Sequence, residues 1–73
     1  MNKVVYQKAI GQAISKAIAS GETDHLKIAT SAEEIYNQTA RESRPKFSPL
    51  TAKESEDLDM DVLRRLQGIE AKK

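Results

Sequence analysis

The segment from Val4 to Ala19 constrains the fold most, because its apolar residues recur at the spacing of an α-helix. Large apolar side chains stand four residues apart, and a row of alanines runs beside them: Tyr6, Ile10, Ile14 and Ile18, then Ala9, Ala13 and Ala17. Residues three or four positions apart share one face of a helix. The pattern therefore predicts an amphipathic helix over residues 3–20.

The apolar stripe of this first helix has two interpretations. It packs in the core of a small helical bundle, or it is a docking surface for another protein or for a second copy of the chain. A chain of 73 residues buries only a modest core, and association would supply further buried apolar area. Under the second interpretation the candidate partner-binding residues come from the stripe and from a later linker: Tyr6, Ile10, Ile14, Phe47 and Leu50.

A second helix is predicted over residues 24–43. Glycine after the last periodic residue is a common C-cap, so the first helix is expected to end at Ser20-Gly21 with a short turn over 21–23. The start of the second helix stays open. Asp24 is a good N-cap for a continuous helix, whereas Ser31 and Glu34 have the spacing of a capping box that begins it later.

Residues 44–51 form a linker, because Pro45 and Pro49 disfavour helix at and before each proline. Phe47 and Leu50 are apolar residues in this otherwise polar segment. They cover the core, form a short extended motif for a partner, or belong to a disordered segment.

A third helix is predicted over residues 52–68. Thr51 and Glu54 have the spacing of a capping box, and Gly68 marks its expected end. Met60 is expected to point away from its apolar stripe, and residues 70–73 are expected to fray. The stripe is made of Leu58, Val62, Leu66 and Ile69.

Together these elements predict an all-α fold in a single small domain over residues 1–73. Because the 21–23 turn is short, the first two helices should form an antiparallel hairpin. The third helix, which follows the proline-containing linker, is expected to pack across the hairpin or to remain loosely attached.

The sequence offers little for catalysis or metal binding. It has no cysteine and one histidine, His25, which we interpret as a capping or core-edge residue. The acids between Glu54 and Asp61 lack the spacing of a calcium loop, and no glycine-rich phosphate loop is present. We therefore expect no enzymatic activity, no cofactor and no metal.

We expect a non-catalytic protein-interaction module: an adaptor, inhibitor or regulator that acts through an amphipathic helix face. The apolar residues are too interrupted for a signal peptide or a transmembrane helix, so we expect a cytoplasmic protein without membrane association. The alternative is a small nucleic-acid-binding regulator, either monomeric or dimeric. Its candidate contacts are the polar and basic residues Lys8, Gln12, Lys16, Arg44 and Lys46.

Overall fold

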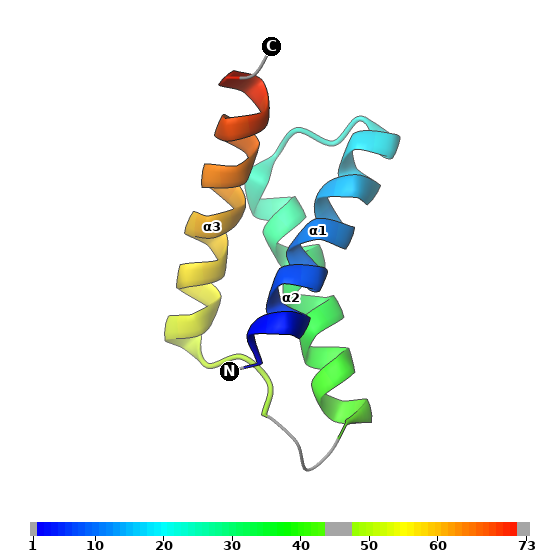
Figure 1. Cartoon of the computed structure of the whole chain (residues 1–73), viewed down its shortest axis with the longest axis vertical. Coiled ribbons are helices and arrows are strands. Elements are labelled where there is room, and N and C mark those ends of the chain that lie inside the picture. Colours follow the sequence, from blue (N-terminus) through cyan, green and yellow to red (C-terminus); the bar gives the residue numbers. More distant parts are fainter. Residues whose placement is uncertain (1, 44–47, 72–73) are drawn as a thin grey trace.

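The computed structural model describes residues 2–43 and 48–71, with side chains through residue 68. Three helices follow one another along the chain: α1 (Lys3–Ser20), α2 (His25–Glu42) and α3 (Ala52–Ala71). Helices α1 and α2 form an antiparallel hairpin, and α3 returns beside α2 in the direction of α1 (Figure 1). The predicted all-α class, with its N-terminal hairpin and third helix, is confirmed.

Helix α1 ends at Ser20, and Gly21 caps its C-terminus, as the sequence predicts. Gly21 has a φ of 77°, a left-handed conformation that glycine adopts without a Cβ clash. Its N–H donates to the Ile18 carbonyl at 3.3 Å, and the Glu22 N–H donates to the Ala17 carbonyl at 2.9 Å. This pair of bonds is the Schellman motif, which reverses the chain toward α2.

Helix α2 is continuous from His25, and it does not begin at Ser31. The Asp24 carboxylate accepts a hydrogen bond of 2.9 Å from the Leu26 N–H, so Asp24 satisfies a backbone donor that the first turn would leave free. The alternative start is therefore wrong, because a competent N-cap is already present seven residues upstream of Ser31, about two helical turns.

The core lies between the three helices and is rich in alanine on α1 and α2. Small side chains let these two backbones approach closely, and α1 and α2 have the most extensive contact of the three helix pairs. Leu58 and Val62 of α3 are fully buried against the hairpin. The alanines of the core cluster are Ala9, Ala13, Ala17, Ala29 and Ala32.

Ile18 does not continue the buried stripe, contrary to the prediction. It is 65% exposed, whereas Ile10 is fully buried and Ile14 is 6% exposed. A step of four residues turns about 40° beyond a full helical turn. Two such steps from Ile10 carry Ile18 past the edge of the core, and Ala17 occupies the buried position instead.

Helix α3 begins as predicted and ends later than predicted. The Thr51 hydroxyl accepts from the Glu54 N–H at 3.2 Å, and the Glu54 carboxylate accepts from the Thr51 N–H at 3.0 Å, which completes the capping box. Gly68 does not terminate the helix, which continues to Ala71. A helical glycine costs only about 1 kcal/mol relative to alanine, and the backbone of Gly68 stays helical. Met60 is 52% exposed, as expected.

Leu50 covers the end of the core nearest the linker. Its side chain is half-buried and packs against the core cluster. Its N–H donates to the Asn37 side-chain oxygen at 2.9 Å, which fixes the chain just before α3. Leu50 is thus a structural residue in this fold, while Phe47 lies outside the described residues.

Candidate functional site

The apolar stripe of α1 faces the core of its own chain. Tyr6, Ile10 and Ile14 are all buried between the helices, so in this fold they present no surface to a partner. These three residues therefore pack in the core of the bundle, which is the first of the two interpretations of the stripe. Any docking surface on α1 must lie on another of its faces.

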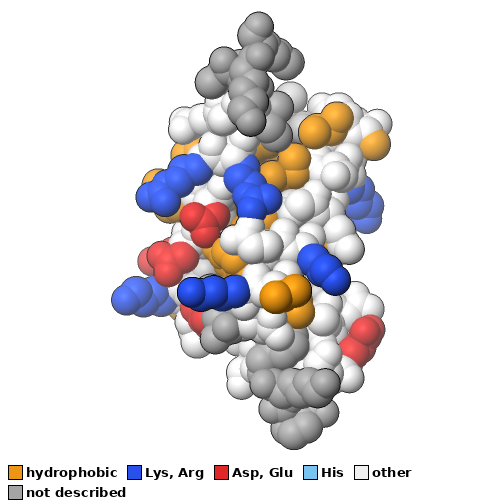
Figure 2. All heavy atoms as spheres, viewed as in Figure 1, with side chains coloured by type: hydrophobic (Ala, Val, Ile, Leu, Met, Phe, Trp, Pro, Cys, Tyr) orange, Lys and Arg blue, Asp and Glu red, His pale blue; other side chains and the backbone are white. Residues whose placement is uncertain are grey.

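A second apolar face of α1 is open to solvent. Val4 and Ile18 are each 65% exposed, and Gly11 lies midway between them in the sequence. Residues seven positions apart differ by only about 20° around a helix, so these three residues share one face. We call it the 4–11–18 face. Figure 2 shows hydrophobic side chains at the surface in the region of α1, with lysine and arginine side chains beside them.

The 4–11–18 face is recessed at its centre. Gly11 has no side chain, and a Cβ atom built on it would meet nothing within 4 Å apart from its chain neighbours and the nearby backbone of its own helix. The face therefore has an exposed branched side chain near each end and a notch in the middle. The four-residue spacing of the predicted core stripe does not indicate this face. Val4 and Gly11 are not members of that stripe, and Ile18 is its last member.

A polar face of α1 lies beside the apolar one. Lys8, Gln12 and Lys16 are exposed, and α1 contains three lysines and no acidic residue. The structure therefore brings together three of the five residues named for nucleic-acid binding. Arg44 and Lys46 lie outside the described residues.

The boundary between α1 and α3 is polar. The Tyr6 hydroxyl donates to the Asp61 carboxylate, and the Arg65 guanidinium donates to the Gln7 side-chain oxygen. Asp61 also lies 3.8 Å from Arg64 within α3. A shallow hollow of about 340 Å³ opens here between Tyr6, Asp61 and their neighbours on α3: Asp57, Met60 and Arg64.

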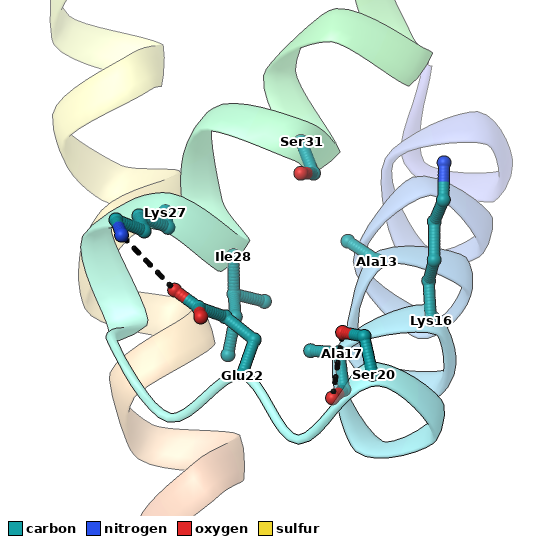
Figure 3. A pocket seen from close by; sticks show the side chains of 8 residues that line it. All are labelled: Ala13, Lys16, Ala17, Ser20, Glu22, Lys27, Ile28 and Ser31. Atoms are coloured by element: carbon teal, nitrogen blue, oxygen red, sulfur yellow. Dashed lines mark hydrogen bonds and ion pairs between the residues drawn. The ribbon is translucent and has the colours of Figure 1, made fainter.

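A second hollow, of about 300 Å³, lies where α1 meets the start of α2 (Figure 3). Ala13, Ala17 and Ile28 line its apolar side. The Glu22 carboxylate points toward Lys27 across the turn, at 3.9 Å, and Lys16 extends along α1 (Figure 3). The hollow is partly open to solvent. One carboxylate oxygen of Glu22, which lines it, is buried without a hydrogen bond and has the Lys27 ammonium at 3.9 Å as its ion-pair partner. The hollow lacks the set of convergent polar groups that a ligand pocket has.

The described residues offer no arrangement for metal chemistry. Within residues 2–43 and 48–68, no group of three or more histidine, cysteine, aspartate or glutamate side chains is placed to hold a metal ion. His25 is the first residue of α2 and is half-buried. In the part of the chain described here, no helix has the length and apolar character needed to cross a membrane.

Comparison with known protein families, with curated proteins and with solved structures finds no match to this chain.

Proposed function

We propose that this protein is a small non-catalytic interaction module, an adaptor, inhibitor or regulator, that binds a protein partner through the 4–11–18 face. The observation that carries the proposal is the shared exposure of Val4 and Ile18 on one side of a helix whose other side forms the core. Single exposed apolar residues are ordinary on protein surfaces. An aligned pair around an open notch is a more specific feature, because it presents two apolar contacts on one side of the helix, with exposed polar residues between them: Gln7, Lys8 and Ser15.

The proposal is tested by charging the face without touching the core. The variant Val4→Lys, Ile18→Lys and the wild type are immobilised, and retained proteins from a lysate of the source cells are compared. The matched control is Leu26→Lys, Met60→Lys, because those side chains are 55% and 52% exposed and belong to α2 and α3. We expect to find a protein that the wild type and the control variant retain in similar amounts. The Val4→Lys, Ile18→Lys variant should retain at least tenfold less of it. Equal retention by the face variant and the wild type would refute the proposal.

The second candidate function is nucleic-acid binding through the basic face of α1. Its support is the exposure of Lys8, Gln12 and Lys16 on a helix that contains no acid. Phosphate contacts by lysine make affinity fall steeply with salt. We expect this function to show as salt-dependent retention on heparin or DNA that Lys8→Glu, Lys16→Glu abolishes. If the wild type and the Lys8→Glu, Lys16→Glu variant were retained equally weakly, nucleic-acid binding by this face would be refuted.

A further inference from the structure

We propose that an acidic amphipathic helix of another protein binds the 4–11–18 face. Its apolar side chains contact Val4 and Ile18. Its carboxylates pair with Lys8 of α1 and Arg65 of α3, which border the face. The inference rests on the proposed function in its use of this face, and it adds the chemistry of the partner. Recognition of this kind combines apolar anchors at helical spacing with charges that select the partner.

Lys8 borders the face on one side. Residues three or four positions apart are neighbours on a helix surface, and Lys8 stands four residues after Val4 and three before Gly11. Its side chain is exposed. Among the described residues, no carboxylate lies within 4.0 Å of the Lys8 ammonium, so its charge is available to a partner.

Arg65 of α3 borders the face on the opposite side, through Gln7. Gln7 stands three residues after Val4 and four before Gly11. That is the reverse of the spacing of Lys8, so Gln7 and Lys8 lie on opposite sides of the face. The Arg65 guanidinium donates a hydrogen bond to the Gln7 side-chain oxygen, and Arg65 is exposed. The face therefore lies between two cationic side chains, one from each helix.

The charged residues of α1 are all positive, because the helix contains three lysines and no acid. On α3, the Asp61 carboxylate accepts a hydrogen bond from Tyr6 and lies 3.8 Å from the Arg64 guanidinium, which offsets its charge. Figure 2 shows lysine and arginine side chains over both helices on the viewed side. Carboxylates of a partner are attracted to such a surface, whereas another copy of α1 would add its own lysines to it.

The shape of the face suits a helix of the partner. From Val4 to Ile18 it extends about 21 Å along α1, at a rise of about 1.5 Å per residue, so an occupant helix needs about four turns. Gly11 leaves a recess midway, which has room for a large apolar side chain of the partner. Exposed polar residues lie between the apolar ones, and such a mixture is ordinary in a non-obligate interface.

These observations favour a protein over a nucleic acid as the occupant. A phosphate backbone would pair with the two cations, but it would leave Val4 and Ile18, each 65% exposed, in contact with water. An acidic helix contacts both kinds of side chain. A single helix covers less than the roughly 800 Å² per partner of a standard interface, so we expect a transient complex that weakens with salt.

Fluorescence anisotropy with two matched peptides tests the charge of the partner. The probe is a labelled helical peptide of about 18 residues, with leucines three and four positions apart and glutamates on either side of them. The control peptide has lysine at each glutamate position. We expect the full chain to bind the glutamate peptide at least about tenfold more tightly than the lysine peptide at low salt. Equal binding of the two peptides, or no binding of the glutamate peptide, would overturn the proposal.

Two variants separate this face from a general attraction between opposite charges. Lys8→Glu, Arg65→Glu should lose the glutamate peptide and gain the lysine peptide. Val4→Lys, Ile18→Lys should also bind the glutamate peptide more weakly, although it adds two positive charges, because the apolar contacts are lost. Stronger binding of the glutamate peptide by Val4→Lys, Ile18→Lys would show that charge alone drives the association, and would overturn the proposal.

Lys16→Glu is the matched control on the same helix. Lys16 stands five residues after Gly11, about 140° around the helix, so its replacement should change binding of the glutamate peptide by less than about twofold. Lys8→Glu alone leaves the bond between Arg65 and Gln7 in place and should still weaken binding severalfold. Equal losses in Lys8→Glu and Lys16→Glu would show that the peptide does not bind at this face.

A DNA duplex of about two turns, titrated in the same way, separates the two classes of macromolecule. Tighter binding of the duplex than of the glutamate peptide, lost in both Lys8→Glu and Lys16→Glu, would overturn the acidic helix in favour of nucleic acid. The lysate experiment separates this inference from the proposed function. A protein that Val4→Lys, Ile18→Lys fails to retain, but that Lys8→Glu, Arg65→Glu retains as well as the wild type, would overturn the acidic-helix inference alone.

Discussion

The Tyr6 hydroxyl donates a hydrogen bond to the carboxylate of Asp61 and so joins α1 to α3. The Tyr6 ring also meets Tyr36 of α2 edge to face, with centroids 6.5 Å apart and planes at 78°. Tyr36 in turn accepts a hydrogen bond of 3.0 Å from the Asn2 N–H. Helices α1 and α3 have the least contact of the three pairs, so this bond is a main attachment between them.

Replacing Tyr6 with phenylalanine should lower the free energy of unfolding by about 1.5–3 kcal/mol, the range for a hydrogen bond to a charged group. The ring contact with Tyr36 is kept, and Asp61 keeps Arg64 as a neighbour. For a chain of this size the loss corresponds to roughly 4–8 °C in melting temperature per kcal/mol. Thermal denaturation followed by circular dichroism measures it. A change of less than 0.5 kcal/mol would show that the bond does not hold α3 in place.

Alkaline pH should weaken the same attachment. Burial, together with the hydrogen bond to Asp61 and its charge, raises the pKa of Tyr6 above its ordinary value. The folded state therefore keeps a proton that the unfolded state releases, and stability falls as pH rises above about 10, the ordinary tyrosine pKa. Urea titrations at pH 8, 10 and 11 should show this fall, and Tyr6→Phe should reduce it. An identical pH dependence in both proteins would contradict the assignment.

Glu33 of α2 and Asp59 of α3 are two acidic residues whose negative charges interact between the helices. Burial raises the pKa of Glu33, and both the negative charge of Asp59 and a hydrogen bond with Asp59 add to the effect, while a hydrogen bond with Ser55 opposes it. A carboxyl group with a raised pKa in the folded state contributes stability at low pH and loses it as pH rises above the ordinary glutamate value.

We therefore expect Glu33→Gln to stabilise the protein at pH 7 by up to about 1 kcal/mol, the scale of partly exposed charge pairs. The gain should be smaller at pH 4, because the raised pKa of Glu33 means that its carboxyl group already holds a proton there in the wild type. Glu34→Gln is the control, because Glu34 is exposed on the same helix. Melting temperatures at both pH values decide the point, and an equal effect of the two substitutions would exclude a specific repulsion from Asp59.

The helices and their caps could be predicted because each depends on neighbours in the sequence. Gly21, Asp24 and the Thr51–Glu54 box all act within a few residues of their positions. The bond between Tyr6 and Asp61 spans 55 positions, and no local pattern indicates which tyrosine will reach which acid. The candidate site was missed for a related reason, since the i, i+4 stripe assigns Ile18 to the core while the helix turns it into solvent.

A four-residue spacing drifts around the helix, so two isoleucines of the predicted stripe, Ile10 and Ile18, have different burial. Their replacement with alanine should therefore change the stability by different amounts. Ile10→Ala should cost about 2–5 kcal/mol, because it leaves a cavity among fully buried side chains. Ile18→Ala should change stability by no more than about 0.5 kcal/mol in dilute solution, as expected for a surface position. Urea denaturation at low micromolar concentration compares the two. Similar losses would mean that Ile18 is also packed in the core.

Gly21 and Gly68 should respond oppositely to alanine, although both have open space at the Cβ position. Gly21 has a φ of 77°, where a Cβ approaches the following carbonyl oxygen, so Gly21→Ala should destabilise the protein by about 1–2 kcal/mol. Gly68 lies inside α3, so Gly68→Ala should stabilise it by up to about 1 kcal/mol. Urea midpoints of the two variants test the sign of each effect. If Gly21→Ala were as stabilising as Gly68→Ala, the Schellman turn between α1 and α2 would not be the conformation that the chain adopts in solution.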